Sequence, residues 1–251
     1  MSKRALIAGE SWMTYSVHVK GFDSFTTSTY EEGVEFLQNA LEQGGYEVEF
    51  LPNHIADRSF PTAISELEDY DVLILSDIGA NTLLLHPDTF VKSVATTNRL
   101  DLIAQYVRNG GGLVMVGGYL SFQGIEGKAN YKDSPIEDVL PVTLYKGDDR
   151  VEKPSGVIAK LVSPEHPCVD GVEDNWPALL GYNRLKPREN ATIIAEHEGD
   201  PILAVREVGE GRTAIFASDC GPHWAPPDFV QWDGYNLLWQ GITDWLAGII
   251  K

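Results

Sequence analysis

The first half of the chain alternates apolar runs with amphipathic segments, and this alternation constrains the fold more than any other feature. Apolar runs at 4–9, 71–77 and 113–118 are typical of buried strands, and 46–51 alternates apolar and polar residues as a strand does. Three intervening segments have helical spacing, at 30–45, 60–70 and 99–112. Strands and helices in this order predict a parallel sheet with right-handed crossovers and helices on both faces.

The second half predicts further strands and one long helix. Strands are expected at 156–162 and 191–197, followed by a hairpin over 202–218 that turns at 209–211. The last helix is expected over 232–250, with apolar residues at steps of three and four that mark a core-facing stripe: Trp232, Tyr235, Leu238, Trp239, Ile242, Trp245, Leu246 and Ile249. No repeat or linker interrupts the chain, so we expect a single domain over residues 1–251.

Charge and cysteine content exclude several classes of partner. The 37 acidic and 19 basic residues give a formal charge of −18, which disfavours nucleic acid and anionic membrane surfaces. The first apolar run is too short for a signal peptide, and no later stretch has transmembrane length. Cys168 and Cys220 form neither a disulfide framework nor a metal-ligand spacing. We therefore expect a cytoplasmic protein with reduced thiols, no cofactor and no metal.

Polar and aromatic side chains follow four of the predicted strands. In open parallel sheets, ligands bind beyond the carboxyl ends of the strands. This rule predicts that Glu10, Asp219 and His223 are the catalytic candidates. The candidate ligand-binding residues are Trp12, Asp77, Gly118, Tyr119, Ser121 and Trp224.

Each candidate also has a structural interpretation. Glu10 or Asp77 can cap a helix or tie down a loop. Cys220, three residues before His223, is either a nucleophile with a nearby base or a buried structural cysteine. His18 falls in a segment, 16–25, that we expect to be an irregular loop. The aromatic residues belong to the site, to the core or to a subunit interface.

The segment VGGYLSFQ (116–123) resembles the nucleophile elbow of the class I glutamine amidotransferase-like superfamily. That pattern runs Gly, apolar, Cys, apolar, Gly, x, Gln. Here Gly117 stands at the first glycine, Tyr119 at the cysteine, Ser121 at the second glycine and Gln123 at the glutamine. The resemblance implies a flavodoxin-like three-layer sandwich with a mainly parallel sheet and a late antiparallel β excursion.

Further segments extend the resemblance over almost the whole chain. They are similar to a subgroup of amidotransferase-like proteins of uncertain activity: GESW, VKGFDSFTT, LSDIGANTLLL, GGYLSFQGIEGKA, DDRVE, WPALLGYN and SDCGPHW. More distantly, the chain is similar to ThuA-like proteins and to the trimerisation domain of some β-galactosidases. These relatives, together with six tryptophans, predict a homo-oligomer with an aromatic-rich interface.

The chain departs from the family at its catalytic residues. Working amidotransferases use the elbow cysteine with a late His-x-Glu, whereas this chain has Tyr119 and the sequence His223-Trp224-Ala225. A phenol with a pKa of about 10 is protonated at neutral pH. The departure predicts that the glutaminase triad is absent. We expect the elbow to bind a ligand oxygen through the amides that open the next helix.

The sequence therefore predicts binding of a small polar or sugar-like metabolite. Two alternatives remain open. One is a hydrolase that uses His223 with Asp219, Glu10 or Cys220, and the other is a non-catalytic oligomerisation module.

Overall fold

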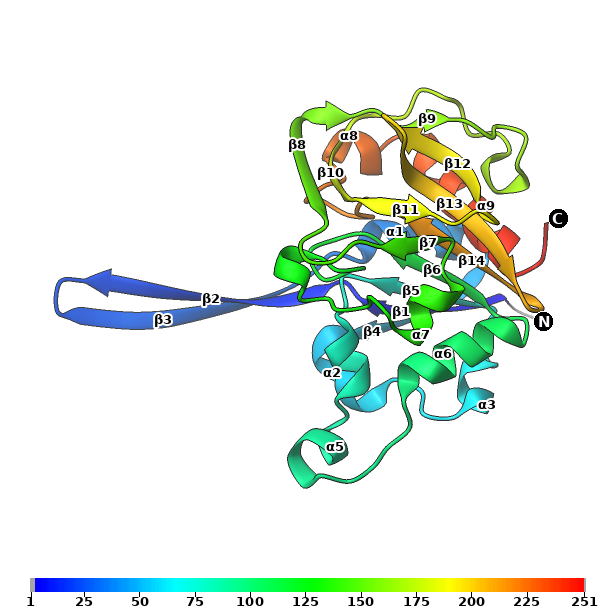
Figure 1. Ribbon diagram of the computed structural model, residues 1–251. Helices are drawn as coiled ribbons and strands as arrows, with labels where there is room; N and C mark the ends of the chain where they lie inside the picture. Colours follow the sequence, from blue (N-terminus) through cyan, green and yellow to red (C-terminus); the bar gives the residue numbers. More distant parts are fainter. Residues whose placement is uncertain (1–2, 251) are drawn as a thin grey trace.

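The computed structural model describes residues 3–250 and is built around one eight-stranded sheet (Figure 1). Its strands lie in the order β4 (Tyr46–Pro52), β1 (Lys3–Gly9), β5 (Val72–Ser76), β6 (Gly112–Val116), β14 (Gly211–Phe216), β13 (Asp200–Val208), β12 (Thr192–His197) and β9 (Lys160–Leu161). The first five are parallel, and their order is that of flavodoxin-like sheets. The last three are antiparallel, so both the fold class and the late antiparallel excursion are confirmed.

Helices cover both faces of the parallel strands, as right-handed crossovers require (Figure 1). One face carries α1 (Glu35–Gln43) and α9 (Gly234–Leu246), which pack against each other. The other face carries a group of mutually packed helices: α2 (Asn53–Ser59), α3 (Ile64–Leu67), α4 (Ala80–Leu84), α6 (Arg99–Arg108) and α7 (Pro135–Val139). None of the helices described over residues 3–250 combines the length and apolarity needed to cross a membrane.

Smaller elements complete the chain. Two-stranded sheets are formed by β8 (Arg150–Val157) with β10 (Leu179–Asn183) and by β7 (Val142–Leu144) with β11 (Leu185–Pro187). Short helical turns lie at α5 (Pro87–Lys92), α8 (Pro227–Val230), η1 (Ile125–Gly127) and η2 (Pro167–Val169).

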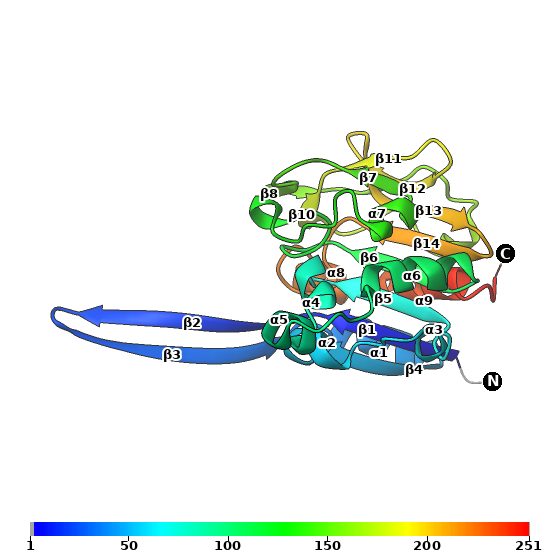
Figure 2. The same ribbon diagram turned by 60° about the horizontal axis from the view of Figure 1, so that its bottom comes forward.

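The prediction of an irregular loop around His18 is wrong. Residues 11–32 form a hairpin of β2 (Ser11–Lys20) and β3 (Asp23–Glu32), which projects from the sheet as a long arm (Figures 1 and 2). Ten cross-strand pairs run from Ser11–Glu32 at its base to Lys20–Asp23 at its tip. Hereafter "the arm" means residues 11–32.

Three predicted boundaries also change. The helix predicted over 30–45 begins only at Glu35, because residues 30–32 pair with β2 in the arm. The strand predicted over 156–162 is split, since β8 ends at Val157 and the short β9 follows. The last helix stops at Leu246, which leaves Ile249 about half exposed rather than in the core.

The apolar stripe of α9 supplies much of the core on its side of the sheet. Trp239 is fully buried, and its ring meets Phe216 of β14 edge-on with the centroids 5.2 Å apart. Leu237 lies on the same helix but is 47% exposed. The predicted stripe is thus confirmed over the length of α9.

Trp239 should therefore contribute strongly to stability. Trp239→Ala leaves a large cavity and should lower the free energy of unfolding by about 3–5 kcal/mol. Leu237→Ala, the matched control on the exposed side of α9, should change it by no more than about 0.5 kcal/mol. Urea unfolding followed by circular dichroism measures both, and equal effects would contradict this assignment of the core face.

Candidate functional site

A pocket of about 500 Å³ opens at the carboxyl ends of β1, β5, β6 and β14, at the base of the arm. Its lining residues are Glu10, Trp12, Gly33, Asp77, Tyr119, Leu120, Ile125, Asp219, Gly221, Pro222 and His223. The structure thus brings together all three catalytic candidates and three of the ligand-binding candidates, Trp12, Asp77 and Tyr119. The strand-end rule placed them correctly because these four strands are parallel neighbours.

Glu10 and Asp77 leave their strands in the same unusual way. Each is the first residue after a parallel strand, and each has left-handed backbone torsion, with φ of 41° at Glu10 and 46° at Asp77. Non-glycine residues rarely adopt this conformation, and it occurs often at binding sites. The Glu10 amide donates to the Ser76 carbonyl at 2.9 Å, so the two strand ends are joined.

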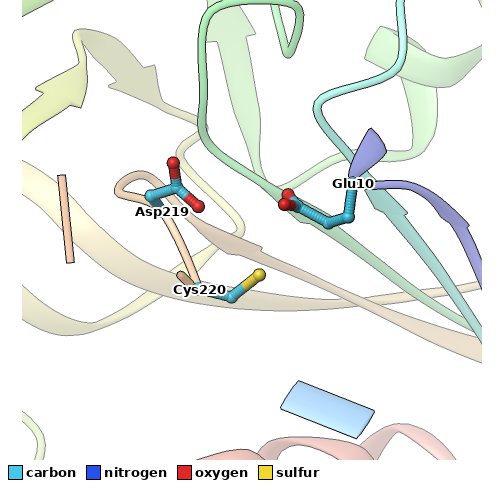
Figure 3. Close-up of side chains that lie close together, drawn as sticks. All are labelled: Glu10, Asp219 and Cys220. Carbon is cyan, nitrogen blue, oxygen red and sulfur yellow. The ribbon is translucent and has the colours of Figure 1, made fainter. Parts of the chain in front are cut away.

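Glu10, Asp219 and Cys220 point toward one another (Figure 3), and the first two line the pocket. All three are buried. The Ser76 hydroxyl donates to Glu10 Oε1, and the Gly221 amide donates to Asp219 Oδ1 at 3.1 Å. Few donors therefore compensate two carboxyl groups that have been removed from water.

Burial changes the protonation of this cluster. Loss of water, with the charge of Asp77 nearby, raises the pKa of Glu10 to about 7. Burial, with the charges of Glu10 and Asp77, raises the pKa of Asp219 well above its usual range. Burial also raises the pKa of the Cys220 thiol, so the sulfur stays protonated. The pocket therefore presents carboxyl groups that can donate as well as accept hydrogen bonds near neutral pH.

The same three residues offer one possible ligand set for a cation. One ligand atom from each lies within 4.8 Å of the others. A cation would have to displace the protons that burial keeps on these groups.

Aromatic rings also line the pocket. The Tyr119 ring meets the His223 ring edge-on, with the two centroids 4.5 Å apart. The Arg150 guanidinium lies 4.4 Å from the centroid of the Tyr119 ring. The Tyr119 hydroxyl donates to Glu152 Oε1 at 2.8 Å, so its proton is already used within the protein. His223 is half-exposed at the mouth, where its Nδ1 lies 3.9 Å from Asp219 Oδ2.

Three predicted ligand-binding residues lie behind the pocket instead. The Ser121 hydroxyl is buried and accepts from the Asp77 amide at 3.1 Å. Trp224 is buried, stacks under His223 and donates from Nε1 to Glu152 Oε2 at 3.0 Å. Gly118 has a φ of 150°, and a Cβ there would come within 2.8 Å of Asp77 Oδ1. These three residues position the lining rather than belong to it.

The prediction of a helix directly after the elbow is wrong. Residues 117–124 form a series of turns, and five of their amides donate within the protein: those of Gly117, Gly118, Leu120, Gln123 and Gly124. The Gly118 amide donates to Asn183 Oδ1 at 3.0 Å, and the Leu120 amide donates to Asp77 Oδ1 at 2.6 Å. These amides therefore do not form an open cradle for a ligand oxygen.

Sequence reasoning missed the residues that hold this turn. Buried Asp149 accepts from the Gln123 and Gly124 amides, both at 2.9 Å, and from Asn183 Nδ2 at 2.8 Å. Glu152 links Tyr119 to Trp224. Asp149 and Glu152 lie far from the elbow in sequence, and only the unusual density of charge in KGDDRVE marks them.

The match to known families agrees with this geometry. The family model described as "Putative glutamine amidotransferase" (GATase1_like) matches residues 4–248. The chain belongs to this family. The resemblance expected from residues 116–123 is thereby confirmed. No curated protein sequence matches the chain.

Solved structures support the same relationship. The chain is 48% identical to the cytoplasmic protein STM3548 from Salmonella typhimurium, with a TM-score of 0.93 over 96% of this chain and 98% of that one. It is 46% identical to STM1381 from Salmonella typhimurium LT2, also with a TM-score of 0.93, over 97% and 99% of the two chains. A ThuA-like protein from Parabacteroides merdae shares the fold at 13% identity, with a TM-score of 0.58 over 98% and 90%.

The raised pKa of Glu10 predicts a specific pH dependence of stability. Folded Glu10 retains its proton up to a pH of about 7, whereas the unfolded side chain loses it near its ordinary pKa of 4.5. The folded state therefore loses stability as the pH rises from 4.5 to 7. Glu10→Gln, which needs no proton, should match the wild type below pH 4.5. Above pH 7 it should be more stable by on the order of 2–3 kcal/mol.

Melting temperatures between pH 4 and pH 9 test this prediction. Glu35→Gln removes an exposed carboxylate from α1 and is the matched control for loss of one charge. A constant difference between Glu10→Gln and the wild type across this range would show that Glu10 does not bind a proton on folding.

Proposed function

We propose that the protein binds a small polar, sugar-like metabolite in the pocket at the base of the arm. The observation that carries the proposal is the presence of buried, proton-bearing carboxyl groups and aromatic side chains in the lining of one cavity. Hydroxyl groups of a sugar both donate and accept hydrogen bonds, which suits carboxyl groups in mixed protonation states. The apolar face of a sugar ring suits the rings of Trp12 and Tyr119.

Each lining group has a role in this proposal. Glu10 and Asp219 donate to or accept from ligand hydroxyls at the closed end. Asp77, fixed by the Leu120 amide, is an acceptor. His223 lies at the mouth next to Asp219 and carries protons between the buried group and solvent.

We propose further that the protein has no glutaminase activity, although it belongs to an amidotransferase family. Tyr119 stands where the cysteine is expected, and its pKa is raised by burial and by the bond to Glu152. In nucleophile elbows the amide after the nucleophile stabilises the oxyanion, but here the Leu120 amide is bonded to Asp77. Cys220 does not replace the missing nucleophile, since burial keeps its thiol protonated.

Hydrolysis of the bound metabolite is the second candidate function. The pKa of about 7 at Glu10 favours it, because a group that titrates near the working pH can act as a general acid or base. In that reaction Glu10 would remove a proton from an attacking water molecule, and His223 would return a proton to the leaving group.

Location and assembly are also proposals. Two similar proteins are described as cytoplasmic, which supports a cytoplasmic location for this chain. The homo-oligomer stays a prediction. The number of tryptophans does not support it, because four of the six are buried within the chain: Trp176, Trp224, Trp239 and Trp245.

The proposal about glutaminase predicts a negative result with a positive control. Purified protein given glutamine should release no ammonia above the buffer background, whereas an active amidotransferase assayed in parallel does so. Cys220→Ser should leave this result unchanged. If the wild type releases ammonia and Cys220→Ser does not, the proposal is contradicted and Cys220 is identified as the nucleophile.

The binding proposal predicts separate effects on binding and stability. A panel of neutral mono- and disaccharides, screened by thermal shift, should contain compounds that stabilise the wild type. Asp219→Asn and His223→Ala should weaken binding of those compounds at least tenfold, measured by calorimetry, without lowering the melting temperature. Asp228→Asn, an exposed carboxyl change in α8, is the control.

Two outcomes contradict the binding proposal. If no saccharide at millimolar concentration shifts the melting temperature, the ligand class is wrong. If Asp219→Asn and His223→Ala lower stability and leave binding unchanged, these residues tie down a loop.

A further inference from the structure

The arm carries an apolar face that the rest of the chain leaves exposed. Directly paired residues of a hairpin share a face, so Met13 lies beside Tyr30, and Tyr15, Val17 and Val19 lie opposite Ser28, Thr26 and Ser24. We call the face formed by Met13, Tyr15, Val17, Val19 and Tyr30 the apolar arm face. Its members are between 40% and 70% exposed.

The opposite face of the arm is mainly polar. It carries Thr14, Ser16, Thr27 and Thr29 between Trp12 at the base and a stacked His18–Phe25 pair near the tip. A strand that separates apolar from polar side chains in this way is typical of a sheet with one face buried. The base of the arm contacts the body, where β2 meets α2 and the Tyr30 ring meets the His54 ring.

An uncovered arm of this kind would be unstable. A two-stranded hairpin alone is marginal in water, and long apolar edge strands pair readily with other chains. Each strand has ten residues and spans roughly 33 Å at about 3.3 Å per residue. The ordered length of the arm therefore requires something to cover its apolar face.

We propose that the apolar arm face packs against the same face of a second copy of this chain, with the two arms antiparallel about a two-fold axis. A face that meets itself in this way forms an isologous contact. Covered aromatic side chains bury roughly 150–250 Å² each. Two tyrosines with a methionine and two valines therefore supply several hundred Å² per copy, close to the roughly 800 Å² of a stable interface.

Charge favours contact through the arms. The chain carries a formal charge of −18, but residues 13–30 contain only Lys20 and Asp23, which balance. Two acidic bodies in direct contact would repel each other, whereas residues 13–30 of the two arms, which carry no net formal charge, would not.

Charge also favours the antiparallel direction of the two arms over the parallel one. Parallel arms would place both bodies at the same end. Antiparallel arms separate them by roughly an arm length, which exceeds the Debye length of about 8 Å at physiological salt.

The antiparallel arrangement has a consequence for the base of each arm. The tip of one arm must lie at the base of the other, on the apolar arm face beside Met13 and Tyr30. Phe22, at the tip, is fully exposed in the single chain. The partner's Phe22 therefore covers Met13 and Tyr30, on the side of the arm away from Trp12 and the pocket. This assembly stands independently of which ligand the pocket binds.

Light scattering tests the dimer and its contact face. The wild type should have twice the 27.7 kDa mass of one chain at micromolar concentration. The double variant Tyr15→Asp with Val17→Asp should fall to the mass of one chain. Thr14→Asp with Ser16→Asp adds the same charge on the polar face and should stay dimeric. Both variants should keep the wild-type circular dichroism of the body, because these positions lie outside its core.

Cysteine cross-linking tests the direction of the arms. In one chain Met13 and Phe22 lie at opposite ends of the arm. Phe22→Cys combined with Met13→Cys should give a covalent dimer with a short bismaleimide. Either single variant should give none. Cys168 and Cys220 are buried, so the wild type is the unreactive control.

Several results would overturn the proposal. A wild type that stays monomeric contradicts the dimer, and a mass of three chains contradicts the two-fold axis, because an odd number of chains cannot all pair through an isologous contact. Dissociation by the polar-face variant instead of the apolar-face variant shows that the other face is covered. Cross-linking of Phe22→Cys alone shows that the arms lie parallel.

Discussion

The left-handed backbone at Glu10 and Asp77 is the constraint on which the site and the arm depend. A strand that continued past Gly9 or Ser76 would carry both side chains away from the sheet edge. Instead the chain turns sharply, and the Glu10 amide bonds to the Ser76 carbonyl. The turn at Glu10 directs the following residues outward as the arm and leaves its carboxyl group buried. The turn at Asp77 brings its carboxylate to the Leu120 amide, which fixes Tyr119 over the pocket.

This arrangement is costly for the folded state. Two residues hold a strained conformation, and two buried carboxyl groups keep protons that they would lose in water. Hydrogen-bond donors reduce this cost without removing it, since burial raises the pKa of Asp149 to about 6 although that carboxyl group accepts from three donors at the turn after β6. Stability of this kind is sacrificed most often where a ligand later supplies the missing partners.

Periodicity predicted the sheet and its helices well because both are local consequences of burial. The runs at 46–51 and 71–77 became β4 and β5, and the glycine pair after Gln43 ended α1. The strand-end rule then brought distant residues such as Glu10 and Asp219 to one pocket. The arm was missed because the alternating apolar residues of Met13–Val19 do not pack against the rest of their own chain, so their alternation did not mark a strand of the sheet. The roles of Ser121 and Trp224 were missed because they depend on contacts between elements far apart in sequence.

The elbow shows how a family's turn can persist while its chemistry changes. Its glycines remain necessary, since a Cβ at Gly117 would come within 2.3 Å of the Ala217 carbonyl oxygen, and one at Gly118 would strike Asp77. The Gly118, Leu120 and Gln123 amides are bonded to Asn183, Asp77 and Asp149, so these three donors do not face a developing negative charge. A turn whose nucleophile is replaced still has one use, which is to hold an aromatic side chain in the lining of the pocket. Tyr119 is held there by its hydrogen bond to Glu152 and by the Arg150 guanidinium over its ring.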